Sequence, residues 1–276
     1  MLDTITSRPA VLIPLLASLP VLLMSCDDSE YRAMPVYNQA YQQNYEADQI
    51  PGILDNARNA YVLIDPFDGN NAASVDAIKQ QGNEVGAYIS IGTGETYRDD
   101  FSAMRPFLVS EPWDAWSDEY FVNRTDEKLL NIMKTRIDKI ADWGFDWVEF
   151  DNMDWFYDDK EREVHDFQVT RAEGINYYRT LCDHVHSKNM KCMAKNTVEG
   201  ATNFDGVTYE SYPDERNWWD QTGAQDFLDA GKLVIINHYN EENCAKAYRQ
   251  YKEIYSGNLS FICEDAKAEK YVHFNQ

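Results

Sequence analysis

Basic residues are scarce in this chain of 276 residues. It has 25 lysines and arginines against 47 aspartates and glutamates, which gives a formal net charge of −22. A field of this sign repels phosphate groups, so the composition argues against a nucleic-acid partner and favours a neutral or cationic ligand. Intrinsic disorder is excluded as well, because 44% of the residues are hydrophobic and 13% are aromatic.

The sequence also lacks an apolar run long enough to span a membrane. Residues 9–25 carry no charge, but Pro14 and Pro20 interrupt them, and the run is shorter than the roughly 20 residues that a bilayer requires. A basic start at Arg8 followed by a short apolar stretch is typical of a secretory signal peptide. We therefore expect the chain to be exported.

The end of this stretch carries a more specific signal. Residues 23–26, Leu-Met-Ser-Cys, resemble the lipobox of bacterial lipoproteins, in which the cysteine is lipidated. We expect a signal peptide over 1–25, a lipid anchor on Cys26 and residence on the periplasmic or cell-surface side of a membrane. Residues 26–50 are polar and are expected to be a tether, which leaves 51–276 as the folded domain.

No CxxC pair is present among the other four cysteines. Export permits disulfides, and four cysteines allow three pairings, so both bridges and buried free thiols stay open. These cysteines are Cys182, Cys192, Cys244 and Cys263.

Short apolar runs alternate with longer amphipathic ones from residue 60 onward. Eight runs are predicted as strands: 60–65, 84–91, 120–122, 145–150, 190–194, 206–209, 233–236 and 259–263. Helical spacing is found at 72–81, 129–143, 167–188, 224–230 and 244–255. Eight strands separated by helices predict a single (β/α)8 TIM barrel. An open doubly wound sheet is the alternative, but no glycine-rich phosphate fingerprint follows the first strand.

Polar residues gather where the predicted strands end. In a parallel barrel these ends meet at one rim, where the chemistry of such enzymes takes place. The residues at these ends are Asp65, Asp151, Asn152, Asp154, Lys195, Asn196, Glu210 and His238. A single aspartate at a strand end is usually a turn former, but their joint occurrence indicates a site.

Paired carboxylates at such a rim suit glycosidic cleavage. One protonates the leaving oxygen while the other attacks the anomeric carbon or guides water to it. Aromatic residues lie close by in sequence and are candidate platforms for sugar rings. They include Trp155, Tyr209, Tyr212, Trp218 and Trp219.

Several short segments together resemble glycoside hydrolase family 114, the endo-α-1,4-polygalactosaminidase-like group. They are residues 64–68, 86–92, 144–154, 195–196, 209–210 and 230–232, and the block at 144–154 is the most specific. The resemblance extends from about residue 60 to 240. It implies a (β/α)8 barrel that cleaves α-1,4-linked galactosamine polymers internally, without a cofactor.

The resemblance also implies the roles of individual residues. Asp151 and Glu210 match the catalytic pair, and we assign Asp151 as the nucleophile and Glu210 as the acid/base. The sugar-binding floor would include Asp65, Tyr88, Asn152, Asp154, Lys195 and Asn196, with Tyr209 and Trp155 as aromatic neighbours. Retention and inversion both stay open, because the sequence gives no distance between the carboxyl groups.

Two other functions are considered. A non-catalytic glycan-binding lipoprotein would have no need of both Asp151 and Glu210. A metal-dependent hydrolase would use Asp151, Asp154, Glu210 and His238, but zinc catalysis usually recruits two or three histidines, so no metal is expected. A monomer is expected. The signal peptide contains one acid and one base, so the charge of −22 belongs to the mature chain and suits a cationic polysaccharide.

Overall fold

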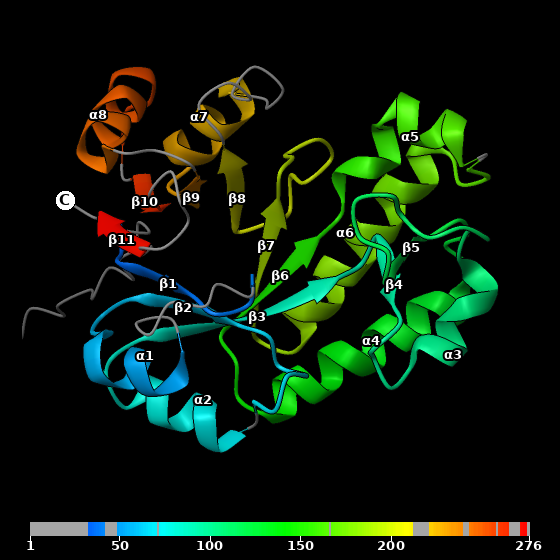
Figure 1. Cartoon of the computed structure of the whole chain (residues 1–276), viewed down its shortest axis with the longest axis horizontal. Helices are drawn as coiled ribbons and strands as arrows, with labels where there is room; N and C mark the ends of the chain where they lie inside the picture. The colour runs from blue at the N-terminus through cyan, green and yellow to red at the C-terminus, as the bar shows by residue number, and fades with distance from the viewer. Residues whose placement is uncertain are drawn as a thin grey trace, which may run out of the picture. The chain divides into compact units, whose positions relative to one another are not determined.

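Eight parallel strands form a nearly closed barrel in the computed structural model, which describes residues 33–41, 49–70, 72–165, 167–211, 221–239, 243–257, 259–264 and 271–274. The strands, in spatial order, are β1 (Val36–Asn38), β2 (Tyr61–Ile64), β3 (Glu84–Ser90), β6 (Trp147–Asp151), β7 (Lys191–Lys195), β8 (Gly206–Ser211), β9 (Leu233–His238) and β10 (Leu259–Glu264). The backbone N–H of Met34 donates to Ser260 Oγ at 2.9 Å, which brings the first strand beside the last. A final strand, β11 (Tyr271–Phe274), pairs antiparallel with β10. The predicted TIM barrel is confirmed (Figure 1).

Two of the strands differ from the sequence-based prediction. The run at 120–122 is not a barrel strand, because β5 (Glu119–Phe121) pairs antiparallel with β4 (Thr93–Glu95) in a separate two-stranded sheet beside the barrel (Figure 1). The missing barrel strand is β1, inside the segment 26–50 expected to be a tether. Backbone pairing of Val36 with Tyr61 places it in the barrel, and three residues carry no apolar run that a pattern could reveal. The folded domain therefore begins before residue 51.

The described residues form eight helices: those at 72–79, 127–142, 171–187, 221–229 and 244–254 confirm the predicted periodicity, and the short ones at 50–56, 101–104 and 159–164 were not predicted. The helices are α1 (Ile50–Asn56), α2 (Ala72–Lys79), α3 (Phe101–Met104), α4 (Glu127–Asp142), α5 (Asp159–Val164), α6 (Arg171–Ser187), α7 (Gln221–Asp229) and α8 (Cys244–Ile254), with short 3-10 turns at Arg105–Phe107 and Asp154–Tyr157. The side chain of Asp126 caps α4 by accepting from two backbone N–H groups. Thr170 and Glu173 form a reciprocal capping box at the start of α6. No helix among the described residues is long and apolar enough to span a bilayer.

The barrel strands place alternate residues on opposite faces. One face packs under the helices in the main core, while Leu63, Trp147, Met193 and Ile235 belong to a smaller cluster inside the barrel. Toward the carboxyl ends of the strands the inward positions become polar. The rim, meaning the carboxyl ends of the eight parallel strands, is therefore the polar end of an otherwise apolar interior.

One disulfide joins helix α8 to strand β10, between Cys244 and Cys263. Cys182 and Cys192 are buried free thiols. Of the pairings that the sequence left open, the structure thus has one bridge and two unpaired cysteines. The expected signal peptide and lipidation site, Cys26, lie outside the described residues, as do Tyr212, Trp218 and Trp219.

Candidate active site

The two predicted catalytic carboxylates converge on one ammonium group. Lys195 Nζ lies 3.0 Å from Asp151 Oδ2 and 3.1 Å from Glu210 Oε2, so these two oxygens are at most 6.1 Å apart. The side chain of Lys195 is only 5% exposed, whereas that of Glu210 is 29% exposed. The three residues come from β6, β7 and β8, which are neighbours in the sheet. The lysine therefore holds the two acids at a fixed separation at the rim.

Asp151 is oriented by two further donors. Tyr88 OH donates to Oδ2 at 2.8 Å, and the backbone N–H of Asn152 donates to Oδ1 at 2.7 Å. Asn152 has a φ of 57°, a left-handed conformation that asparagine tolerates better than most residues. Its side-chain amide donates to Ser90 Oγ at 2.9 Å. Asn152 thus fixes the chain direction after β6 and keeps the carboxylate of Asp151 at the rim.

Glu210 accepts hydrogen bonds at both oxygens. Tyr239 OH donates to Oε1 at 2.8 Å, and Asn196 Nδ2 donates to Oε2 at 3.2 Å. Burial alone would raise the pKa of Glu210, but the ammonium of Lys195 and these hydrogen bonds outweigh burial and lower it below its usual value. Glu210 is therefore predominantly ionised near neutral pH in the ligand-free protein.

A second layer of polar groups supports Lys195 inside the barrel. Its ammonium lies 4.0 Å from the ring centroid of Tyr41, a cation–π contact. Tyr41 OH donates to Glu149 Oε1 at 2.6 Å, and Thr208 Oγ1 donates to Glu149 Oε2 at 2.7 Å. Glu149 is fully buried, and burial raises its pKa to about 7. The position of the lysine thus depends on a tyrosine and an acid that lie beneath it.

Neither of these two supporting residues was predicted from the sequence. Glu149 precedes Asp151 by two positions, so strand alternation already places the two side chains on one face. Tyr41 lies in the segment that was expected to be a tether, and no motif in the neighbouring sequence indicates a role at the site. Tyr239 was missed as well, although it directly follows His238 at the end of β9.

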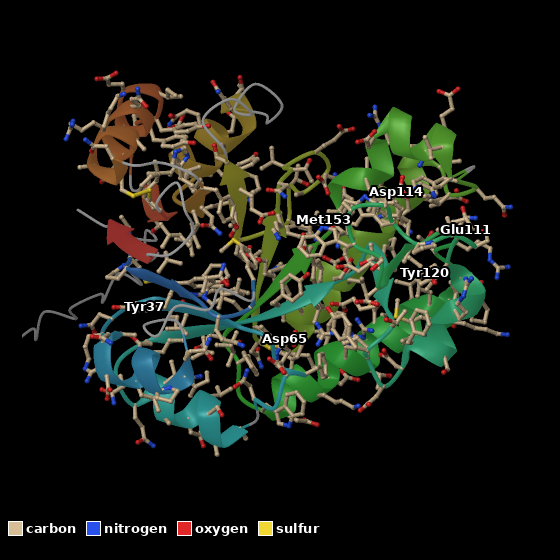
Figure 2. All side chains as sticks on the ribbon, viewed as in Figure 1. Tyr37, Asp65, Glu111, Asp114, Tyr120 and Met153 are labelled. Carbon is tan, nitrogen blue, oxygen red and sulfur yellow. A yellow bond between two sulfur atoms is a disulfide. The ribbon has the colours of Figure 1, made fainter. Side chains whose placement is uncertain are left out.

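Asp154 lies in the 3-10 turn after β6, three residues beyond Asp151. Burial and the charge of Asp151 raise the pKa of Asp154 to about 7. Asp154 thus lies close enough to Asp151 for their charges to interact, and its place in the sugar-binding floor stays a prediction. Its neighbour Met153 lies in the same connection after β6 (Figure 2).

Asp65 is part of a buried ion network. Arg98 donates to both of its carboxylate oxygens, at 2.8 and 2.6 Å, and also binds Glu95 at 2.8 Å. A second guanidinium, that of Arg136, binds both oxygens of Asp100 at 2.7 and 2.6 Å. Asp65 therefore holds the loop after β4 against the rim.

Two predicted aromatic contacts with substrate are wrong. Trp155 is only 4% exposed and stacks on Phe156 at 4.2 Å, within a cluster that also contains Phe121 and Phe167. Tyr209 is fully buried in the main core, because it directly precedes Glu210 on β8 and points to the opposite face of the strand. Neither ring has a face open to a sugar.

The side chain of His238, the last residue of β9, is buried against α8 and is not exposed at the rim. Its Nδ1 lies 3.1 Å from Tyr251 OH, and its ring stacks on Phe261 at 6.0 Å. Within the described ranges, no cluster of three or more histidine, cysteine, aspartate or glutamate side chains is arranged to hold a metal ion.

A nearly closed parallel (β/α)8 barrel with two carboxylates side by side at the carboxyl ends of its strands is the architecture of a TIM-barrel glycosidase. The model of glycoside-hydrolase family GH114 matches residues 29–275. The chain belongs to family GH114 and is a glycoside hydrolase. No curated protein matches the sequence.

Three solved structures illustrate the similarity in fold. Ega3 of Aspergillus fumigatus, crystallised in complex with galactosamine, has a TM-score of 0.66 and 21% identity, covering 88% of this chain and 94% of that chain. The glycoside hydrolase domain of PelA from Pseudomonas aeruginosa has a TM-score of 0.63 and 17% identity, covering 88% and 99%. Trehalose-6-phosphate hydrolase of Bacillus licheniformis has a TM-score of 0.55 and 13% identity, covering 85% and 64%. At these identities the likeness shows the shared barrel fold.

Proposed function

We propose that this protein cleaves α-1,4-linked galactosamine polymers internally, by a retaining mechanism with Asp151 as nucleophile and Glu210 as acid/base. The observation that carries the proposal is the shared contact of both carboxylates with Lys195 Nζ, which limits the separation of Oδ2 and Oε2 to 6.1 Å. Retaining glycosidases place their carboxyl groups about 5 to 5.5 Å apart, and inverting ones about 6.5 to 9.5 Å apart. The geometry favours retention.

The reaction proceeds in two displacements. An oxygen of Asp151 attacks the anomeric carbon while Glu210 gives its proton to the leaving glycosidic oxygen, so the glycosidic bond breaks and a glycosyl ester forms on Asp151. Glu210, now a carboxylate, then takes a proton from water. The water oxygen attacks the anomeric carbon, the ester bond breaks, and Asp151 returns to its carboxylate form.

Three features support an amino-sugar substrate. Ega3, whose fold is similar, was crystallised with galactosamine. The rim has a surplus of acids, because two carboxylates, Asp151 and Glu210, share the ammonium of Lys195. The chain has a net charge of −22. This charge attracts a polymer with free amines, and added salt weakens the attraction.

The direct test is the release of reducing ends from deacetylated and acetylated galactosamine polymers. We expect release by the wild type and its loss in both Asp151→Asn and Glu210→Gln, with circular dichroism unchanged. Glu84→Gln is the matched control, because Glu84 lies at the opposite end of β3 and pairs with Lys191 away from the rim. Binding without release from any polymer would favour the non-catalytic glycan-binding alternative.

The stereochemistry has its own test. Proton NMR of the first products should show the α-anomer if the mechanism is retaining. The β-anomer as the first product would exclude Asp151 as a nucleophile while leaving the two carboxylates as an acid and a base.

We further propose that the mature protein is anchored through a lipidated Cys26. The sequence Leu-Met-Ser-Cys at residues 23–26, after a basic start and an apolar stretch, supports this. Mass spectrometry of the mature N-terminus is expected to show an acylated cysteine. An unmodified Cys26, or a different first residue, would refute the anchor without affecting the catalytic proposal.

A further inference from the structure

A groove of about 780 Å³ lies beside the rim and has no role in the mechanism above. It runs between the loop after β2, the loop after β4 and one side of helix α4. Asp65, which lines it, lies near the centre of the molecule in the view of Figure 2. Ligand sites in proteins commonly enclose about 300 to 1,000 Å³, so the groove is large enough for a small ligand.

The groove presents an aromatic ring that is fixed in place and open to solvent. Tyr97 is 56% exposed, its hydroxyl donates to Glu95 Oε1 at 2.7 Å, and the guanidinium of Arg98 lies 4.9 Å from its ring centroid. Two further rings, Phe67 and Trp143, meet edge to face at 5.7 Å and also line the groove. An anchored ring with a free face is a suitable platform for the C–H face of a sugar.

The charges in the groove favour a cationic group. Its two buried arginines already bind carboxylates, as described above. The exposed acids Asp68 and Asp99 have no hydrogen-bond or ion-pair partner for their side chains among the described residues. One exposed lysine, Lys139, also lines the groove, so the acids without partners outnumber the bases without partners. A protonated amine beside Tyr97 would gain both a carboxylate and a cation–π contact.

The groove reaches the rim at Asp65, the lining residue at the carboxyl end of β2. Asp65 directly follows β2, and the register of β2 with β3 pairs Ile64 with Ala87, so Asp65 lies beside Tyr88. Tyr88 in turn donates to the nucleophile Asp151. A polymer bound across the catalytic pair can therefore extend past Asp65 into the groove.

We propose that this groove is a secondary subsite that binds a further amino-sugar unit of the substrate polymer, with Tyr97 as its stacking platform. The inference rests on the proposed function for the identity of the ligand. It predicts that long chains gain affinity from the groove, whereas oligosaccharides too short to reach it do not.

Tyr97→Ala tests the platform, and Tyr97→Phe is its matched control. We expect Tyr97→Ala to raise KM for the polymer about five-fold while kcat and the cleavage of short oligosaccharides stay unchanged. Tyr97→Phe keeps the ring and its contact with Arg98 and loses only the hydrogen bond to Glu95, so its KM should stay closer to that of the wild type than to that of Tyr97→Ala. Equal losses on long and short substrates, or no change in either, would overturn the subsite.

Asp68→Asn tests the charge. This exposed substitution should weaken binding of deacetylated polymer and leave binding of acetylated polymer unchanged. Asp68→Asn is made in an Asp151→Asn background, and its affinity for each polymer is measured by calorimetry, so that binding is measured without turnover. If the wild type cleaves no polymer, the catalytic proposal fails. The subsite is still tested in that case: an affinity that depends on Tyr97 supports it, and an affinity that does not depend on Tyr97 refutes it.

Discussion

Replacing Lys195 with methionine should move the activity to higher pH. Lys195 Nζ lies 3.1 Å from Glu210 Oε2. Two opposite unit charges at this distance attract each other by about 5 kcal/mol at an effective dielectric constant of about 20. The side chain of Glu210 is 29% exposed, so water screens part of this attraction. Loss of this attraction should raise the pKa of Glu210, because Lys195 is the charge that lowers it.

The pH profile of kcat/KM reports this shift. In the proposed mechanism the first displacement requires a protonated Glu210, so kcat/KM should fall as the pH rises through the pKa of Glu210 in the free enzyme. In the wild type this descending limb lies at low pH, because Lys195 lowers that pKa. In Lys195→Met the limb should move to higher pH. Maximal activity should also fall, since Asp151 and Glu210 lose the group that holds them at a fixed separation.

Lys191→Met is the control on the same strand. Lys191 pairs with Glu84 at 3.2 Å at the other end of β7, where the two side chains are 35% and 37% exposed. It should leave the pH profile unchanged. If the descending limb in Lys195→Met stays in place or moves to lower pH, then Lys195 does not set the ionisation of Glu210, and the assignment of Glu210 as the acid fails with it.

Three further predictions concern stability. Burial raises the pKa of Glu149 from 4.5 to about 7, so the folded protein holds a proton that the unfolded chain releases. The free energy of unfolding should then fall by about 3 kcal/mol as the pH rises through this window, and urea titrations of Glu149→Gln should lack that fall. Arg98→Met removes the guanidinium that binds two buried carboxylates and should lower the free energy of unfolding by about 3 to 5 kcal/mol. Lys79→Met breaks a partly exposed ion pair and should lower it by about 1 kcal/mol or less. Similar shifts of the thermal midpoint in the two variants would contradict this reasoning. Replacing Cys244 and Cys263 with alanine should lower the free energy of unfolding by about 3 kcal/mol and abolish the effect of a reductant on unfolding. If the variant still responds to reductant, the redox-sensitive bond lies elsewhere.

The barrel could be predicted because its strands are buried on both faces. Such strands appear as continuous apolar runs, and seven of the eight barrel strands were found in this way. The exception, β1, has three residues and gains its place through backbone pairing with β2. The run at 120–122 was assigned to the barrel in its place. An apolar run signals a strand, but it does not reveal which partner the strand pairs with.

Aromatic residues near the catalytic pair were harder to assign. Closeness in sequence suggested that Trp155 and Tyr209 contact substrate, yet both are buried. For Tyr209 the alternation of a strand was sufficient to exclude contact, because its neighbour Glu210 points to the rim. For Trp155 only the packing against Phe156 and Phe167 decides the direction of the ring.

The sequence alone determined the class of fold and the family, and it predicted Asp151 and Glu210 as the catalytic pair, because these depend on the pattern of apolar runs and on short motifs. It also determined the charge of −22, which is a property of composition. Only the tertiary structure decided how the pair is held. Lys195 lies between Asp151 and Glu210, and Tyr41 reaches Glu149 from 108 positions away. Closing the barrel brings such distant residues together, and no local pattern in the chain records that contact.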